Sequence, residues 1–263
     1  MGIKAEKILC MKISIITVCY NSAATLEDTI RSVIAQTYPN IEYIIIDGGS
    51  KDGTQAIVEK YREHIACFIS EPDRGLYDAM NKGLQAATGD VIGILNSDDF
   101  FFDEQVVQAV ADNMQGADAV FADIAFYQAP DFERVIRHYS SRPFADSGNW
   151  LRQLAIGNMP AHPSLYVRKA AYDKVGLYSL EYKIAADFDM VARLFTLPDF
   201  TARYLPQVVV KMRPGGLSTQ GIKSKLHLLR EDLAICRSLG IKSNYLKLLS
   251  KYPRKLLGFI IKG

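Results

Sequence analysis

Short apolar segments alternate with amphipathic segments along the first half of the chain. Uninterrupted runs of β-branched and other apolar residues predict buried strands, whereas apolar residues that recur every three or four positions predict helices. The predicted strands are residues 13–19, 41–46, 67–70, 91–95 and 117–122, with helical patterns at 25–34, 54–65, 77–84 and 106–110 between them. This alternation indicates βαβ units, and hence an α/β fold with a Rossmann-like, mostly parallel central sheet flanked by helices.

The second half of the chain has a less regular pattern. From about residue 126 the alternation decays, and residues 140–149 and 157–163 are rich in Pro, Gly and Ser. Helical patterns return at 169–175 and 187–197. We therefore predict a single domain over residues 12–221, with a regular half (12–123), an irregular half (124–221) and a helical tail over 222–263.

The composition is ordinary for a globular protein, with 49% hydrophobic and 23% charged residues among 263. No apolar stretch approaches the roughly 18 residues needed to span a bilayer, and no secretion leader opens the chain. The cysteines have no C-x-x-C spacing, so we expect reduced thiols rather than disulfides or a zinc site. These features favour a cytoplasmic protein.

The net charge of +2 conceals a basic tail. Residues 222–263 hold ten basic and two acidic residues, which gives +8 and leaves −6 for the rest of the chain. Leucines and aromatics interleave with these lysines, a pattern that suits an anionic membrane surface. The alternative is a helix packed on the domain with its lysines solvated. Nothing indicates base reading, so we expect no nucleic acid partner.

Polar clusters follow two of the predicted strands. Asp47-Gly48-Gly49-Ser50 comes after strand 41–46, and Asn96-Ser97-Asp98-Asp99 comes after strand 91–95. Ligands of parallel sheets bind beyond the carboxyl ends of the strands, so we expect both clusters in one cleft. The adjacent carboxylates of Asp98 and Asp99 repel unless Mg²⁺ or Mn²⁺, shared with substrate phosphates, compensates. A solvated turn that caps the next helix is the alternative.

Four segments, taken in order, carry a family resemblance. They are Ile16-Thr17-Val18-Cys19-Tyr20-Asn21, residues 46–54 (Ile-Asp-Gly-Gly-Ser-Lys-Asp-Gly-Thr), Asn81-Lys82-Gly83 with Gly89-Asp90, and Leu95-Asn96-Ser97-Asp98-Asp99. Together they resemble the family 2 inverting glycosyltransferases, which have the GT-A fold. Residues 71–81 further resemble the branch that builds bacterial surface polysaccharides. The resemblance implies a nucleotide-sugar-binding half at 12–123 and an acceptor half at 124–221.

The resemblance implies that Thr17, Tyr20 and Asp47 hold the donor nucleotide. Asp47 would accept a hydrogen bond from the imide N–H of the base, which favours a UDP-sugar. Gly48 replaces the second acid that the family often has there. Asp73 and Arg74 fall on the loop that approaches the nucleotide, where Arg74 either neutralises phosphate charge or lies exposed to solvent.

The metal motif departs from the family's D-x-D pattern. Asn96 replaces the first acid, leaving Asp98 as the expected ligand of Mn²⁺ or Mg²⁺ and Asp99 as its neighbour.

The general base implied by the resemblance is Asp187. It matches the Asp of the family's Glu-Asp pair, with Ala186 in place of the Glu. Asp189 would support the same helix N-terminus, or both acids simply favour a first helical turn. His162 either contacts diphosphate or acceptor or is a structural histidine, and Trp150 either lines the acceptor site or packs. Residues 213–218 resemble a segment that closes over the donor.

We therefore expect inverting transfer of a sugar from a nucleoside-diphosphate sugar to a saccharide or lipid-linked acceptor in surface polysaccharide biosynthesis. The enzyme would be cytoplasmic and peripheral on the inner face of the cell membrane. The alternative is a nucleotide-sugar-binding homologue without activity, motivated by Asn96 and Ala186. A nicotinamide-binding enzyme is disfavoured because no G-x-G-x-x-G follows the first strand.

Overall fold

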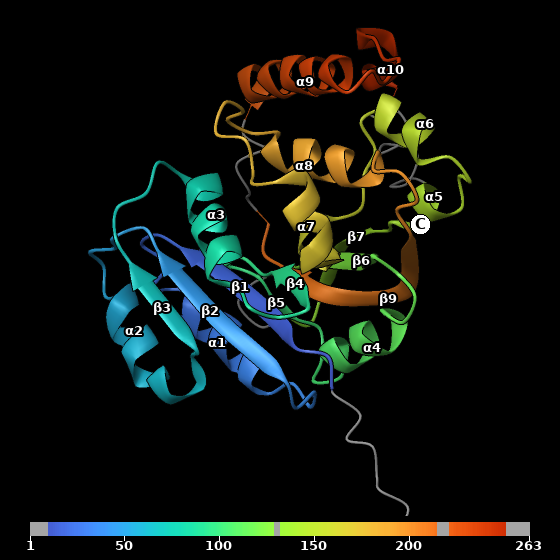
Figure 1. The fold of residues 1–263 in the computed structure, drawn as a ribbon. Coiled ribbons are helices and arrows are strands. Elements are labelled where there is room, and N and C mark those ends of the chain that lie inside the picture. Colours follow the sequence, from blue (N-terminus) through green and yellow to red (C-terminus); the bar gives the residue numbers. More distant parts are fainter. Residues whose placement is uncertain (1–9, 129–131, 215–220, 251–263) are drawn as a thin grey trace, which may run out of the picture.

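The computed structural model describes residues 10–128, 132–214 and 221–250. Its strands form one sheet in the order β3-β2-β1-β4-β8-β6-β9-β5, with β7 paired to β6 (Figure 1). The strands are β1 (Ile13–Cys19), β2 (Ile41–Asp47), β3 (Cys67–Ser70), β4 (Val91–Ile94), β5 (Phe100–Phe101), β6 (Ala119–Tyr127), β7 (Val135–Tyr139), β8 (Tyr166–Arg168) and β9 (Ala202–Met212).

Helices cover both faces of the sheet (Figure 1). The α-helices are α1 (Leu26–Ile34), α2 (Thr54–Lys60), α3 (Leu76–Ala86), α4 (Val106–Asn113), α5 (Arg142–Ala145), α6 (Trp150–Ala155), α7 (Lys169–Val175), α8 (Ala186–Phe195), α9 (Gly221–Ser238) and α10 (Tyr245–Leu249). Two short 3₁₀ helices, η1 (Arg62–His64) and η2 (His162–Ser164), interrupt the connections.

The first four strands in chain order form the parallel part of the sheet, β3-β2-β1-β4. Every residue of β1 is buried, and its side chains alternate between two apolar clusters: Ile13 and Ile15 in one, Ile16 and Val18 in the other. A strand covered on both faces needs apolar residues at every position, which is why the sequence shows unbroken apolar runs. The predicted α/β fold class is confirmed.

The second half extends the sheet with strands of mixed direction. Strand β8 lies antiparallel between β4 and β6, and β9 runs parallel to β6. Strand β6 continues to Tyr127, beyond the predicted end at residue 122, because it pairs with β9 and β7 there. The pattern of β9 was not recognisable as a strand because its buried and exposed positions are irregular and include Pro206.

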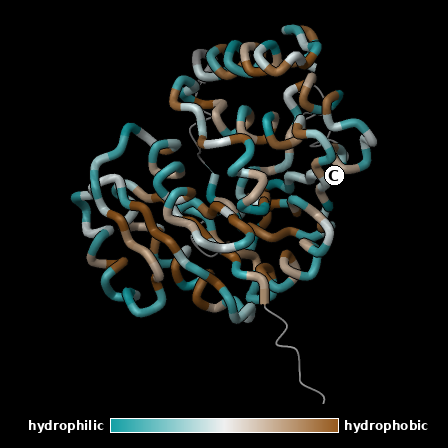
Figure 2. Tube along the Cα trace, in the orientation of Figure 1, coloured by the Kyte–Doolittle hydropathy of each residue, from teal (hydrophilic) through white to brown (hydrophobic). Residues whose placement is uncertain are grey.

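Helix α9 lies across α8 at the top of the molecule (Figure 1). Its inner face joins the main apolar core through Ile235 and Cys236, while Lys225, Arg230 and Arg237 point outward and are exposed. Figure 2 shows the hydrophobic residues concentrated along the strands and the hydrophilic ones toward the periphery. The tail thus packs on the domain with solvated basic side chains at least through α9.

No helix in the described part of the chain is long and apolar enough to cross a bilayer. The end of the basic tail, residues 251–263, lies outside the described residues, as do residues 215–218 of the predicted closing segment 213–218.

Candidate active site

The carboxyl ends of β1, β2 and β4 form one edge of the sheet, tied together by the loop after β1. Cys19 pairs in register with Asp47, and the hydroxyls of Ser22 and Ser97 lie 2.9 Å apart. The Asn21 N–H donates to Ser50 Oγ at 2.8 Å. The prediction that the two polar clusters share this edge is confirmed.

The turn after β2 depends on unusual backbone conformations. Gly49 and Gly53 have positive φ angles of 80° and 98°, which cost little only for glycine. Asn21 across the cleft also has a positive φ, and its side-chain Oδ1 accepts from the Lys51 N–H at 3.0 Å. Gly49, Gly53 and Asn21 therefore determine the backbone conformation of the turn after β2.

Asp47 lies beneath this loop and is fully buried. Its carboxylate accepts from the Ser50 N–H and hydroxyl, from Ser70 Oγ at 2.6 Å and from Gln55 Nε2 at 3.3 Å. Thr17 is also fully buried, and its hydroxyl accepts from the Tyr43 hydroxyl at 3.2 Å. Contacts of these two residues with a nucleotide stay predictions.

Tyr20 is the exposed member of the predicted nucleotide site, with 63% of its surface accessible. Asp73 lies on the facing loop between β3 and α3, where its Oδ1 accepts from the Gly75 N–H at 2.8 Å. Arg74 follows it with an exposed guanidinium that contacts Asp78 at 2.9 Å. Helix α3 holds this loop through Lys82, whose Nζ donates to the Pro72 carbonyl at 3.0 Å. Tyr20, Asp73 and Arg74 thus surround the solvent side of the edge.

The turn after β4 combines an exposed and a buried carboxylate. Asp98 is exposed, whereas Asp99 is only 1% exposed. Burial raises the pKa of Asp99 well above its usual value, and the charge of Asp98 raises it further. The guanidinium of Arg213, at the end of β9, donates to the Asp98 carbonyl at 2.6 Å and pairs with Asp28.

Two acceptor oxygens in this turn, Asn96 Oδ1 and Asp99 Oδ1, are buried without a hydrogen-bond partner in the structure as described. Buried acceptors without donors are costly, and a hard cation would satisfy both. However, the described residues contain no group of three or more His, Cys, Asp or Glu placed to hold a metal ion. The oxygens of this turn therefore fit a divalent ion that takes its remaining ligands from a bound phosphate and water.

Asp187 occupies the first turn of α8, partly exposed. The segment before it is fixed by Glu231 of α9, a buried acid that accepts from the backbone N–H groups of residues 183, 184 and 185 at 2.8, 3.0 and 2.9 Å. Tyr77 of α3 donates to the Ile184 carbonyl at 2.6 Å. Burial raises the pKa of Tyr77, and the charge of Asp187 raises it further.

His162 lies near this segment, with Nε2 2.8 Å from the Tyr178 hydroxyl. Burial lowers the pKa of His162 to about 4, so its imidazole is neutral at pH 7. Asn81 of α3 joins this part of the site to the half of the chain that is predicted to bind the donor. Its Oδ1 accepts from the Tyr178 N–H at 2.7 Å, and its Nδ2 donates to the Tyr178 carbonyl at 2.9 Å.

Two predicted acceptor-side residues have structural partners. Asp189 is buried and paired with Arg193 at 2.8 Å, and Arg193 in turn donates to two carbonyls before α8. Trp150 packs in an aromatic cluster, edge-on to Phe195 with ring centroids 4.9 Å apart. Packing is thus the better description of Trp150 than lining an open site.

Several residues that organise the site had no assigned role in the sequence. Asn81 and Lys82 were recognisable as part of a motif, but their partners lie on distant segments. Gly83 in the same motif permits α3 to contact β1, since a Cβ there would lie 2.4 Å from Ile16 Cγ2. The sequence did not indicate the role of Glu231, because an acidic residue in a basic helix is expected to be exposed to solvent.

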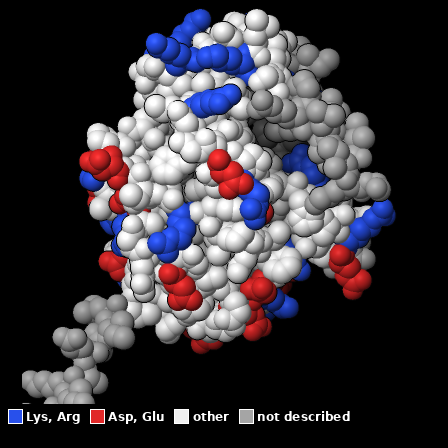
Figure 3. Space-filling view, turned by 90° about the vertical axis from the view of Figure 1, so that its right-hand side faces the viewer, with Lys and Arg blue, Asp and Glu red and all other residues white. Residues whose placement is uncertain are grey.

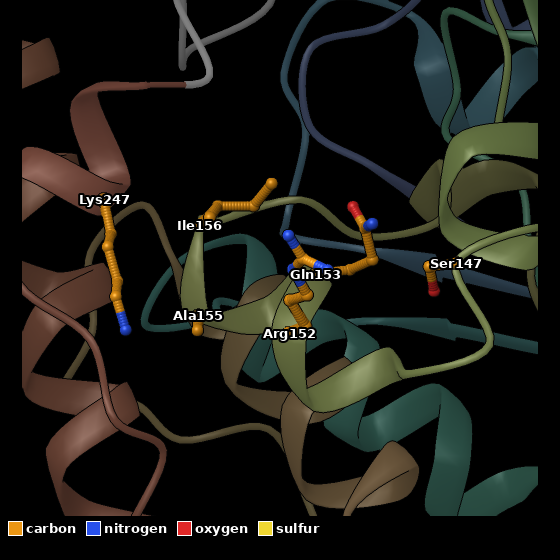
Figure 4. A pocket seen from close by; sticks show the side chains of 6 residues that line it. All are labelled: Ser147, Arg152, Gln153, Ala155, Ile156 and Lys247. Atoms are coloured by element: carbon orange, nitrogen blue, oxygen red, sulfur yellow. The ribbon is translucent and has the colours of Figure 1, made fainter.

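A cavity of about 400 Å³ lies elsewhere, between α6 and α10. Figure 4 shows Arg152 and Gln153 from α6 and Lys247 from α10 around it. None of the predicted site residues lines it, so this cavity is separate from the candidate active site at the strand ends.

Comparison with known proteins identifies the family. Residues 14–174 match the model of glycosyl transferase family 2. A PGL/p-HBAD biosynthesis glycosyltransferase of Mycobacterium bovis is 29% identical over 236 residues, which cover 87% of this chain and 86% of the relative. An uncharacterised glycosyltransferase of Mycobacterium tuberculosis is 33% identical over 183 residues, covering 69% of this chain and 68% of the relative.

Solved structures share the fold at low sequence identity. S. aureus TarS 1–349 in complex with UDP-GlcNAc has a TM-score of 0.65 and 18% identity, over 90% of this chain and 70% of that one. The mannosyltransferase PcManGT from Pyrobaculum calidifontis, in complex with GDP-Man and Mn²⁺, has a TM-score of 0.63 and 16% identity, over 96% and 76%. With a family model that covers more than half of its length, this chain belongs to glycosyl transferase family 2 and is a glycosyltransferase of the GT-A fold.

Proposed function

We propose that this enzyme transfers a sugar, with inversion, from a nucleoside-diphosphate sugar to a hydroxyl of a saccharide or lipid-linked saccharide. The observation that carries the proposal is that α3 is hydrogen-bonded to the segment before Asp187. Tyr77 holds the Ile184 carbonyl and Asn81 holds Tyr178, and α3 begins directly after the loop of the predicted nucleotide site. This arrangement supports a base and a donor site that open on one cleft.

In the proposed reaction, Asp187 accepts the proton of the acceptor hydroxyl while the hydroxyl oxygen attacks the anomeric carbon. The bond from that carbon to the diphosphate breaks, and its electron pair leaves with the diphosphate. Attack from the opposite face inverts the configuration. A positioned carboxylate base typically contributes a factor of about 10²–10⁴ to such a rate.

Asn96, Asp98 and Asp99 would hold Mn²⁺ or Mg²⁺ together with donor phosphates. When bound, the ion neutralises the charge that develops on the leaving diphosphate. The two unpaired oxygens of Asn96 and Asp99 support this assignment, and so does the Mn²⁺ in the complex of PcManGT. Arg213 adds a fixed positive charge beside the same turn.

A UDP-sugar is the favoured donor, supported by the UDP-GlcNAc in the TarS complex. The resemblance of residues 71–81 to surface-polysaccharide enzymes supports a role in that pathway. The name of the mycobacterial relative, which refers to PGL/p-HBAD biosynthesis, supports a biosynthetic transfer.

The test is a donor screen with Mn²⁺ that follows release of nucleoside diphosphate, using wild type, Asp187→Asn and Asp189→Asn. We expect Asp187→Asn to lose acceptor-dependent turnover by a factor of about 10²–10⁴ with donor affinity retained. Asp189→Asn is the matched control two residues along α8, since its partner is Arg193. Full turnover by Asp187→Asn contradicts the base assignment. Donor binding without turnover by the wild type favours the inactive homologue.

The basic tail is the proposed contact with an anionic membrane, on the inner face of the cell membrane. Both acids of the tail, Glu231 and Asp232, are buried, so the described outer face of α9 and α10 carries only positive charge. Figure 3 shows these Lys and Arg side chains gathered at the top of the molecule. Exposed apolar residues accompany them, namely Leu226, Tyr245, Leu246 and Leu249.

Flotation with vesicles of anionic and of neutral lipid tests this contact. We expect the wild type to float with anionic vesicles, and a variant with Lys225, Arg230 and Arg237 changed to Gln to lose most of this binding. The control changes the exposed residues Arg62, Lys174 and Arg203, which lie on other elements. Equal flotation of the two triple variants would exclude a specific contact through α9.

A further inference from the structure

We propose that the carboxylate of Asp73, on the loop between β3 and α3, recognises the base of the donor nucleotide in place of an acid at the end of β2. Its Oδ2 would accept a hydrogen bond from the ring N–H of the base. This inference rests on the proposed function and deepens it, because it names the residue that selects the nucleotide.

The acceptors of Asp47 are already in use. Its buried carboxylate takes hydrogen bonds from Ser50, Gln55 and Ser70. A base that bound to this carboxylate would have to displace those donors, and Ser50, which is buried, would lose its acceptor. Asp47 therefore serves to hold the strand ends together, and the base needs another acceptor.

The space beside Gly48 contains that acceptor. A Cβ built on Gly48 would lie 2.5 Å from Asp73 Oδ2 and 3.2 Å from Tyr20 Cδ2. The φ angle of Gly48 is not positive, so its backbone conformation does not require glycine. The missing side chain instead makes room for the carboxylate of Asp73. The carboxylate beside Gly48 is thus supplied by the facing loop and not by the strand end.

The carboxylate of Asp73 is held in place with one oxygen available. Oδ1 accepts from the Gly75 N–H at 2.8 Å, whereas Oδ2 has no hydrogen-bond partner among residues 10–128, 132–214 and 221–250. Lys82 anchors the loop through the Pro72 carbonyl and Glu71. The exposed ring of Tyr20 borders the same space beside Gly48 and offers a face on which a base can stack.

A carboxylate at this position discriminates between bases by chemistry. It only accepts hydrogen bonds, so it pairs with the ring N–H of uracil or guanine. The corresponding ring nitrogens of cytosine and adenine are acceptors and would repel it. The site should therefore prefer UDP over CDP, or GDP over ADP if it takes a purine.

The test measures binding of UDP, CDP, GDP and ADP to the full chain by calorimetry. We expect the wild type to bind UDP at least about tenfold more tightly than CDP, or GDP at least about tenfold more tightly than ADP. This ratio is the effect of one hydrogen bond to a charged group. Asp73→Ala should reduce that ratio to about twofold or less. Asp73→Asn keeps an acceptor for Gly75 and should lower the ratio several-fold.

A rescue variant makes the test specific. Gly48→Asp alone should lose binding, because the new side chain meets the carboxylate of Asp73. The double variant Gly48→Asp/Asp73→Ala should restore the preference, since it returns the acid to the strand end. Glu71→Gln removes the same charge from the same loop and should keep the wild-type ratio, because the amide oxygen can still accept from Lys82 and Lys82 still holds the Pro72 carbonyl.

Any of three results would overturn the inference. One is an unchanged ratio in Asp73→Ala, and another is an equal loss in Glu71→Gln, which would indicate a general charge effect. Wild-type binding without any preference among the four bases also overturns it. Failure of the wild type to bind any nucleotide instead contradicts the proposed function itself.

Discussion

The predicted donor side and the predicted acceptor side of the site are held by contacts of very different range along the chain. On the donor side, the carboxylate of Asp47 is surrounded by Ser50, Gln55 and Ser70, all within 23 positions along the chain. On the acceptor side, the segment before Asp187 is held by Glu231 from up to 48 positions away, and by Tyr77 from 107 away. Local motifs therefore surround Asp47, whereas tertiary packing positions the segment before Asp187.

The largest expected effect separates the two sides through Glu231. Changing Glu231 to Ala leaves three backbone N–H groups without their buried acceptor, at a cost of about 3–5 kcal/mol in the free energy of unfolding. Transfer rate should fall much more than nucleotide affinity. Urea unfolding and calorimetry measure the two quantities, with Arg230→Ala as the exposed neighbour that should change neither stability nor turnover. Equal loss of affinity and rate would show that the two sides are not separately held.

The reciprocal change is on the donor side. Asp47→Asn places an amide N–H₂ among hydrogen-bond donors, so we expect a loss of about 2–3 kcal/mol in stability. Here nucleotide affinity should fall at least as much as transfer rate at saturating donor. Ser70→Ala removes one donor only and should cost about 1 kcal/mol. Unchanged nucleotide binding by Asp47→Asn would argue against Asp47 as the organiser of the strand ends.

A smaller effect is expected at the joint between the sides. Asn81→Ala removes both hydrogen bonds to the backbone of Tyr178, at a cost of about 1–3 kcal/mol. Because Asn81 connects α3 to the acceptor side, turnover should fall while UDP affinity stays within about twofold. Asn81→Asp, which can still accept from the Tyr178 N–H, should retain more stability than Asn81→Ala.

The smallest expected effect is a pH dependence due to His162. Its pKa is about 4 in the folded protein and 6.5 without the effect of burial, so the unfolded state binds the proton first as pH falls. This residue therefore destabilises the fold as pH drops from about 6.5 toward 4, by about 1–2 kcal/mol between pH 7 and pH 5. Comparing urea unfolding of wild type and His162→Gln at both pH values isolates the contribution. Identical pH dependence would mean that the imidazole is hydrated in the fold.

The sequence was informative where structure is local. The unbroken apolar runs of β1, β2 and β4 follow from burial on both faces, and the polar clusters after them had to meet because the strands are parallel. Strand β9 was not predictable, because its exposed positions and Pro206 break the pattern. Glu231 was not predictable either, since its burial depends on the packing of α9 on α8.

The position of α9 also determines how far Asp187 would lie from a membrane bound to the outer face of that helix. The helix has Glu231 on its inner side, against the segment that carries Asp187, and the basic side chains on its outer side. An α-helix with its side chains is about 10 Å across. A protein resting on the outer face of α9 would therefore carry the proposed base at least one helix diameter above the lipid headgroups. A lipid-linked acceptor would have to extend its sugar outward by that distance, which favours acceptors whose glycan is already partly built.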